Sequence, residues 1–417
     1  MPAKVTKVER FTLVVPLVER IRKEMARADI HTWAETEICK VATDAGVVGW
    51  GETITHYTWG RVSNEERVIG RPPAEMMWDD SLGAGLQMAL FDAAGKLAGV
   101  PVYRLFGKKC RDWCPVSFWD HDMSPEKYAE EVKVAVSLGY TCMKMKARPW
   151  HDVRETMRLM SAATPDHFAI DADWNDFLIN VSNAVPVLRE LEESFPKIKI
   201  WESPMRMADA SGNRLLRDRI ERAIAHHFGA VPPRTAVEMG VCDGFVIGGG
   251  AARTMADGTF SATVHMPFFL QMVGTGLTTT MSLHLGAVLT HAQWPAVNCH
   301  ELYEHNLLTK RLDVVAGAIR VPEEPGLGIE VDEGALERYR VEKPDHTLPR
   351  HLIKVTRPCG VRIYFTQHLH SMWQFYQTGN APVGEWGCRT ELIEDDGTAE
   401  FDDLYKRSSE SPVVTSQ

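Results

Sequence analysis

Three short apolar segments, each ending in charged residues, most constrain what this chain can fold into. They are Cys142–Lys146, Phe168–Asp173 and Ile198–Glu202. The stretches between them have helical periodicity, and strands that alternate with helices predict a parallel β-sheet. In such sheets the chemistry gathers at the carboxyl ends of the strands. Those ends carry two lysines, two aspartates and a glutamate, so the sequence predicts a site there.

The alternation extends over residues 113–334. Further strands are predicted at 115–119, 222–227, 244–247, 261–265 and 296–299, with a long helix over 276–291. Eight strands with helices between most of them favour a closed parallel barrel. An open doubly wound sheet is the alternative, but no GxGxxG motif opens a helix near the start of the chain. The fold class predicted for this region is therefore α/β.

Two further regions flank the alternating one. Residues 1–112 are predicted to form a small α+β domain, with a hairpin at 35–53 around Asp44-Ala-Gly46 and a helix at 83–98. Within it, residues 18–30 are charged, lack an apolar face and are expected to form a loop. Residues 335–417 are expected to fold back onto the N-terminal domain and to end in a disordered tail from about residue 408.

The composition is that of an ordinary globular protein, with 44% apolar and 24% charged residues among 417. A net charge of −10 without a basic run disfavours nucleic-acid and membrane-surface partners. No apolar run approaches the ~20 residues of a membrane-spanning helix. Eight cysteines without a CxxC pair predict reduced thiols and a cytoplasmic protein.

The charged strand ends have both a functional and a structural interpretation. Lys144 and Lys146 could be surface lysines on an edge strand, but inside a barrel two inward lysines would be costly without a role. Asp171 and Glu202 could be helix N-caps, or oxygen ligands for a hard cation such as Mg²⁺. Asp173 is interpreted as a cap or a supporting group.

Several motifs, taken together and in order, resemble the enolase superfamily, in particular its mandelate racemase and muconate-lactonizing branch. The likeness covers about residues 4–340. The motifs that carry it are Gly49-Trp-Gly51-Glu52, Phe91-Asp92-Ala-Ala-Gly95-Lys96, Gly99-Val-Pro101, Leu105-Phe-Gly107, Lys144-Met-Lys146, Asp171, Glu202 and Pro325-Gly-Leu-Gly328.

The resemblance implies an N-terminal α+β capping domain over a (β/α)7β barrel, which is a TIM-like barrel. It also implies a Mg²⁺ ion and abstraction of the proton α to a carboxylate. Lys146 would be the base, Lys144 would tune it, and Asp171 and Glu202 would bind the metal. A metal ion stabilises the charge that develops on the substrate carboxylate, and a neighbouring lysine lowers the pKa of the base.

This chain also departs from the family pattern. The third metal ligand of the family is a carboxylate at the end of strand five, where this chain has His226 and His227. Adjacent strand residues face opposite sides, so at most one histidine points into the site, and His227 is the candidate. Histidine suits Mn²⁺ or another divalent cation better than Mg²⁺. The His–Asp dyad of the family's racemases is not visible, because its positions are occupied by Gly248 and Phe268.

The resemblance also suggests substrate-binding residues. Glu301 matches a glutamate that can hydrogen-bond the substrate carboxylate, and Arg22 or Lys23 would hold the distal end of an acid sugar from a closing loop. The favoured reaction is dehydration of an acid sugar. The alternatives are a racemase or epimerase of a hydroxy or amino carboxylate, and a catalytically silent scaffold. The expected partners are a small carboxylate substrate and further copies of the chain in a homo-oligomer.

Overall fold

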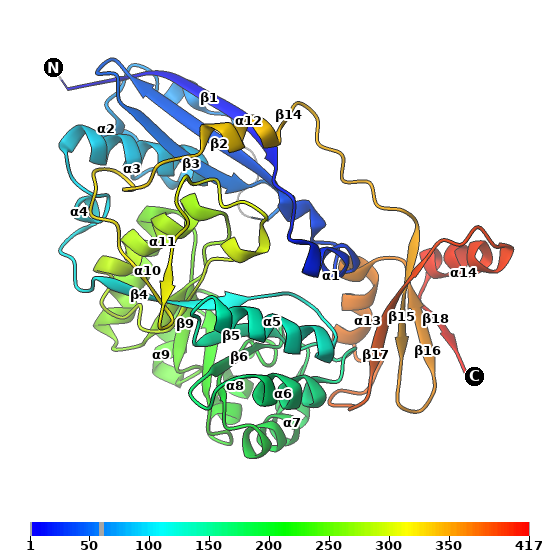
Figure 1. The fold of residues 1–417 in the computed structure, drawn as a ribbon. Coiled ribbons are helices and arrows are strands. Elements are labelled where there is room, and N and C mark those ends of the chain that lie inside the picture. Colours follow the sequence, from blue (N-terminus) through cyan, green and yellow to red (C-terminus); the bar gives the residue numbers. More distant parts are fainter. Residues whose placement is uncertain (1, 58–61, 417) are drawn as a thin grey trace. The chain divides into compact units, whose positions relative to one another are not determined.

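The computed structural model describes residues 2–57 and 62–416 (Figure 1). The chain forms two compact units, each assembled from three separate stretches. Unit 1 comprises residues up to 18, residues 32–119 and residues 245–345, and unit 2 comprises residues 19–31, residues 120–244 and the chain from 346 onward. Within the described ranges, no helix is both long and apolar enough to cross a bilayer.

Unit 1 contains an antiparallel sheet with the strand order β14-β1-β2-β3. Its strands are β1 (Val5–Val14), β2 (Glu35–Thr43), β3 (Val48–Ile54) and β14 (Arg340–Val341), and its helices are α2 (Pro73–Met76), α3 (Ala84–Ala98), α4 (Tyr103–Phe106) and α12 (Glu333–Tyr339). The predicted hairpin and helix of the N-terminal domain are both confirmed. Gly46 has a φ of +75°, as the tight turn of the hairpin requires.

The glycines of the first motif let β3 approach α3 closely. A Cβ at Gly49 would lie 2.1 Å from the carbonyl oxygen of Ala89, so only glycine fits there. Asp92 on α3 accepts hydrogen bonds from the amides of Trp50, at 2.9 Å, and Leu327, at 2.8 Å. Three motifs that lie far apart in the sequence therefore meet at one buried carboxylate.

Unit 1 also contains strands from both ends of the alternating region. These elements are β4 (Trp113–Trp119), β9 (Gly244–Ile247), α10 (Ala251–Thr263), β10 (Phe268–Leu270), α11 (Gly276–Val288), β11 (Ala296–Val297), β12 (Val314–Val315) and β13 (Ala318–Arg320). β4 pairs with β11, and β9 with β10, in parallel. The predicted strand at 261–265 is wrong, because residues 261–263 finish helix α10 and the strand follows at 268–270.

Unit 2 contains four consecutive parallel strands, β5 to β8. Its elements in this region are α5 (Pro125–Ser137), β5 (Cys142–Lys146), α6 (Val153–Ala163), β6 (Ala169–Asp173), α7 (Val181–Ser194), β7 (Ile198–Glu202), α8 (Ala210–Arg217), β8 (Ala223–His227) and α9 (Pro233–Met239). Ser124 caps α5 by accepting a hydrogen bond from the amide of Lys127, as predicted. The three charged segments are thus neighbouring strands.

The segment predicted as a charged loop, residues 18–30, is largely helical. A 3₁₀ turn (Glu19–Ile21) leads into α1 (Arg22–Arg27) in unit 2. Ile21 and Met25 are fully buried, and Arg27 is buried beside Asp122. The prediction fails because only a few apolar side chains, spaced four apart, form the buried face among many charges.

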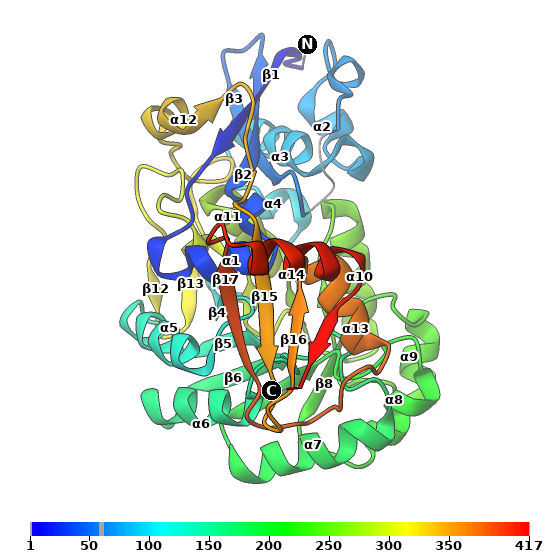
Figure 2. The ribbon, with the colours of Figure 1, turned by 90° about the vertical axis from the view of Figure 1, so that its right-hand side faces the viewer.

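The C-terminal module, residues 346–417, forms an antiparallel sheet with the order β17-β15-β16-β18 (Figure 2). Its elements are β15 (His351–Thr356), β16 (Arg362–Phe365), a π-helical turn η6 (His368–Met372), α13 (Trp373–Gln377), β17 (Arg389–Glu394), α14 (Ala399–Glu410) and β18 (Val413–Thr415). The expected disordered tail is corrected, because α14 continues through residue 410 and β18 pairs with β16.

The module shares a hydrophobic core with the loops that follow β5 and β6. Trp150 and Phe177 from those loops pack against the module's apolar residues Ile353, Val355, Ile363, Phe365, Met372, Tyr376 and Ala381. The prediction that this segment folds onto the N-terminal domain is therefore corrected, since its core belongs to unit 2. Alternate residues of β15 and β16 form the apolar face that this packing buries.

Candidate active site

Lys144 and Lys146 lie on one face of β5 and make ion pairs with carboxylates of the next two strands. Lys146 Nζ lies 2.5 Å from Asp173 Oδ2. Lys144 Nζ lies 2.5 Å from Glu202 Oε2 and 3.5 Å from Asp173 Oδ2. The side chains of Lys144, Asp173 and Glu202 are at most 2% exposed. Strand register explains the cluster, because Lys146 pairs with Asp173, and Asp173 with Glu202, across the sheet.

The charges of this cluster shift one another's pKa values. Burial lowers the pKa of Lys146; Asp173 opposes that shift, while Lys144 and Arg148 add to it. Burial alone would raise the pKa of Asp173, but the cations of Lys146, Lys144 and Arg148 hold it well below its usual range. Asp173 is thus ionised, while Lys146 gives up its proton more easily than an ordinary lysine.

Asp171 lies two residues before Asp173 on β6, and its surroundings are different. It is partnered across the sheet with Lys144, and its Oδ2 accepts a hydrogen bond of 3.3 Å from the thiol of Cys142. Burial raises the pKa of Asp171 to about 7. Asp173 lies beside Lys146 and Glu202 in the strand register, whereas Asp171 lies beside Lys144, and its role as a metal ligand stays a prediction.

The two histidines of β8 face opposite sides, as the alternation of a strand requires. His227 Nε2 lies 3.3 Å from Glu202 Oε1, and the side chain is 40% exposed. His226 is 3% exposed, and neither of its ring nitrogens has a hydrogen-bond partner among the described residues. Burial lowers the pKa of His226 to about 3, so its ring is neutral. Only His227 belongs to the charged cluster.

Arg148 continues the row of cations beyond β5. Its Nη2 donates a hydrogen bond of 2.8 Å to Asn175 Oδ1, which also accepts one of 3.1 Å from Lys146 Nζ. The amide of Asn175 in turn donates to Asp173 Oδ1 at 2.9 Å. Asn175 has a φ of +43°, a left-handed conformation that asparagine tolerates better than most residues. Lys146 and Arg148 are therefore linked through the side chain of Asn175, and Asp173 through its backbone amide.

Neither Asp173 nor Arg148 was singled out for chemistry from the sequence, although the signal was present. Lys144-x-Lys146-x-Arg148 and Asp171-x-Asp173-x-Asn175 both keep the period of two that places side chains on one strand face. Alternation predicts that these residues share one face of their strand. Which of them lies beside the charged residues of the next strand depends on the register between neighbouring strands.

The three other predicted site residues are Glu301, Arg22 and Lys23. Glu301 belongs to unit 1, where it forms an ion pair with Arg311. Arg22 pairs with Glu19 at 2.5 Å and is about half exposed, and Lys23 is exposed on α1. Their roles in substrate binding stay predictions.

The donor set of the cluster suits a divalent cation. Asp173 and Glu202 are cross-strand partners with nearly buried carboxylates, and both already face one positive charge, the ammonium of Lys144. His227 adds an imidazole nitrogen beside Glu202. Two carboxylates and one imidazole are ligands that Mg²⁺ accepts and Mn²⁺ favours.

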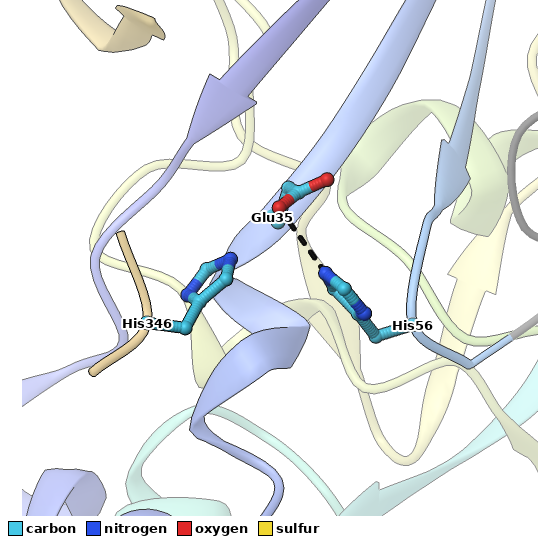
Figure 3. Close-up of side chains that lie close together, drawn as sticks. All are labelled: Glu35, His56 and His346. Atoms are coloured by element: carbon cyan, nitrogen blue, oxygen red, sulfur yellow. Dashed lines mark hydrogen bonds and ion pairs between the residues drawn. The ribbon is translucent and has the colours of Figure 1, made fainter. Parts of the chain in front are cut away.

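Unit 1 also contains two neighbouring side chains that could bind a metal ion, Glu35 and His56 (Figure 3). His56 Nε2 lies 3.1 Å from Glu35 Oε2, and the hydroxyl of Thr55 donates to Glu35 Oε1 at 2.7 Å. His346, also drawn in Figure 3, belongs to unit 2.

Comparison with known proteins gives the same family for most of the barrel region. The family described as "Enolase C-terminal domain-like" matches residues 127–335, which is half of the chain. The match ends before the C-terminal module begins.

Characterised relatives include both dehydratases and racemases. An arabinonate dehydratase of Saccharolobus solfataricus is 23% identical over 343 residues, covering 72% of this chain and 89% of that protein. A D-galactonate dehydratase of Xanthomonas oryzae is 26% identical, and the alignment covers 74% of this chain and 92% of that protein. An N-succinyl-L-Arg/Lys racemase of Bacillus cereus is 23% identical and covers 73% and 90%.

Solved structures support the fold. The N-succinyl Arg/Lys racemase of Bacillus cereus aligns with a TM-score of 0.66 at 20% identity, covering 81% of this chain and 98% of that one. An enolase-superfamily member from Roseovarius nubinhibens, complexed with magnesium, aligns with a TM-score of 0.63 at 22% identity, covering 82% and 100%. The predicted fold, a TIM-like (β/α)7β barrel with an N-terminal α+β capping domain, is confirmed. The chain belongs to the enolase superfamily, in its mandelate racemase and muconate-lactonizing branch.

Proposed function

We propose that this chain abstracts the proton α to the carboxylate of an acid sugar and dehydrates it, with Lys146 as the base. The observation that carries this proposal is the position of Lys146. Its ammonium nitrogen lies at the carboxyl end of β5, 2.5 Å from Asp173 and 3.1 Å from Asn175, and burial lowers its pKa. A base for a carbon acid works best when its pKa lies near the working pH.

The other charged residues support this role. Asp173, Glu202 and His227 would hold a divalent cation, which for this superfamily is Mg²⁺, with Mn²⁺ an alternative because of the histidine. When bound, the cation would stabilise the negative charge that develops on the substrate carboxylate. Lys144, held between Glu202 and Asp173, keeps a second positive charge close to Lys146 and so favours its neutral form.

Dehydration suits the cluster better than racemisation. Racemisation needs acid–base groups on both faces of the substrate carbon, whereas Lys144 and Lys146 point to the same face of one strand. Dehydration needs one base and an acid for the leaving hydroxide. The relatives include enzymes of both kinds, so racemisation or epimerisation is the second candidate.

A silent scaffold is disfavoured by the cost of the cluster. Two lysines and two carboxylates are held in a nearly buried site, which is expensive unless each charge is paired and used. A small carboxylate is the proposed partner. A cytoplasmic location and a homo-oligomeric assembly stay predictions from the sequence.

Solvent exchange tests the proposal across many candidate substrates at once. The protein with Mg²⁺ is incubated in deuterium oxide with a library of acid sugars, and mass spectrometry follows deuterium uptake and loss of water. We expect at least one acid sugar to lose water, which turns its α-carbon into a ketone, and the substrate that remains to exchange its α-hydrogen for deuterium. Exchange without water loss would favour the epimerase, and no exchange across the library with metal bound would favour the silent scaffold.

A further inference from the structure

Arg148 is a fully buried guanidinium whose hydrogen bonds are incomplete. The residue is 0% exposed, and Nη2 donates to Asn175. Nε and Nη1 have no hydrogen-bond partner among the described residues. A buried arginine normally forms bidentate contacts with a carboxylate or phosphate, because its five donors are fixed in a planar fork. Two nitrogens of this side chain are therefore left for an acceptor that the chain does not supply.

Aromatic side chains hold this guanidinium in place. Its central carbon lies 5.7 Å from the ring of Trp150, 5.4 Å from that of Phe177 and 5.0 Å from that of Trp373. Aromatic faces attract a guanidinium but accept no strong hydrogen bond from its edge. The indole nitrogen of Trp373 is likewise buried without a partner among the described residues. Three unpartnered donors thus belong to two side chains in contact.

The position of Trp373 depends on the C-terminal module. The turn before it, η6, is fixed at His368, whose amide donates to Asp29 Oδ2 at 2.7 Å and whose ring pairs with the buried Asp122. His368 also packs against Trp150 at 5.3 Å. A π-helical turn in this place is unusual and is frequent at functional sites. The module therefore places an aromatic ring against Arg148 from outside the region that matches the family.

We propose that Arg148 binds the carboxylate of the substrate, and that the C-terminal module positions Arg148 for this through Trp373. The inference rests on the proposed function, because it makes an acid sugar the ligand of the same site. Arg148 and Lys146 both donate to Asn175 Oδ1, so the guanidinium lies close to the proposed base. Lys144 is already held by Glu202, which leaves Arg148 as the cation with free donors.

Binding, measured apart from turnover, tests this inference. Isothermal titration calorimetry with Mg²⁺ present follows arabinonate and galactonate, with arabinitol and galactitol as uncharged counterparts. All variants of the full chain carry Lys146→Met, which stops turnover. Arg148→Met should weaken aldonate binding at least about tenfold, the loss expected for hydrogen bonds to a charged group, and leave alditol binding unchanged. Arg158→Met, at an exposed arginine of α6 paired with Glu155, should change neither.

The module is tested in the same assay. Trp373→Leu should reduce the preference for the aldonate over the alditol, whereas Trp386→Phe, at a tryptophan of the module that bonds Glu190, should not. Should Arg148→Met fail to fold by circular dichroism, Arg148→Lys keeps the charge without the planar fork and should still lose part of the preference.

The outcomes separate the inference from the proposed function. Folded Arg148 variants that bind aldonates as tightly as the parent would overturn the inference. Equal losses for aldonate and alditol would assign Arg148 a purely structural role, and a parent that binds no aldonate would also reject it. The wild type could bind aldonates through Arg148 and still show no α-proton exchange. That result would support carboxylate binding by Arg148 and reject dehydration.

Discussion

At the scale of single residues, the site is decided by which member of an alternating pair reaches the charged cluster. Lys144-x-Lys146 and Asp171-x-Asp173 each offer two candidates on one strand face. The sequence predicts the face correctly, because alternation is a local property. It does not predict which residues of the neighbouring strands lie beside each candidate, because that depends on the register between the strands. Asp173 lies opposite Lys146 and Glu202, whereas Asp171 lies opposite Lys144 and Ile200.

The two aspartates should respond differently to loss of charge. Asp173→Asn should weaken Mg²⁺ or Mn²⁺ binding at least about tenfold, because an ionised ligand is lost. Asp171→Asn should change it less, since Asp171 accepts a hydrogen bond from Cys142 and is paired across the sheet with Ile200 instead of Glu202. Calorimetric titration of each folded variant with the metal measures both effects. The reverse order would restore Asp171 as the ligand.

Substitutions of the two histidines of β8 should also differ in their effects on metal affinity. His227→Ala should lower metal affinity with little effect on stability, because its side chain is partly exposed and beside Glu202. His226→Leu should leave metal affinity unchanged and should not lower the thermal midpoint, because it removes a buried ring with unsatisfied nitrogens. Thermal unfolding and metal titration on both variants check this, and equal effects on affinity would remove His227 from the site.

At the scale of elements, most strands and helices could be predicted, and the failures have physical causes. The hairpin, α3 and the strands β5 to β8 follow from period, capping residues and turn glycines. The strand predicted at 261–265 failed because its β-branched residues lie at the end of a helix, where tertiary packing overrides propensity. Helix α1 was missed because its buried residues are few and include a charged one, Arg27, besides Met25 and the preceding Ile21.

The burial of α1 predicts how residues 20–23 respond to protease. Because Ile21 and Met25 are fully buried, trypsin should cut slowly after Arg22 and Lys23 even without a ligand. Met25→Ala should accelerate cleavage, since removing a buried methionine side chain costs about 2–5 kcal/mol. Glu19→Ala, which removes only an exposed ion pair, is the control. Fast cleavage of the wild type that slows with substrate would instead indicate a mobile lid.

At the scale of the whole molecule, the C-terminal module is the part that the sequence predicted least. Its apolar segments indicated that it folds, but no local pattern says which surface it covers. In the structure its core includes Trp150 and Phe177, which follow strands β5 and β6 of unit 2. The N-terminal sheet and the barrel strands could be predicted because their motifs resemble a known family, and the family match ends at residue 335.

The shared core predicts that the module and strands β5 and β6 are stabilised together. Phe365→Ala, at a fully buried residue of β16, should cost about 3–5 kcal/mol. Hydrogen exchange should then become faster in peptides that cover β5 and β6 as well as in the module. Peptides from β1 to β3 of unit 1 serve as the internal control and should be unchanged. Faster exchange confined to the module would show that its core is independent of the site.

The central claim is that Lys146 takes the α-proton, and one measurement tests it most directly. Wild type and Lys146→Ala are compared, with Mg²⁺ and a confirmed acid-sugar substrate in deuterium oxide, for the rate of water loss and for α-deuterium in the recovered substrate. Removing a general base typically costs two to four orders of magnitude in rate. We predict that Lys146→Ala loses both exchange and dehydration at least to this extent while circular dichroism stays native. Exchange at the wild-type rate in the folded variant would contradict the account.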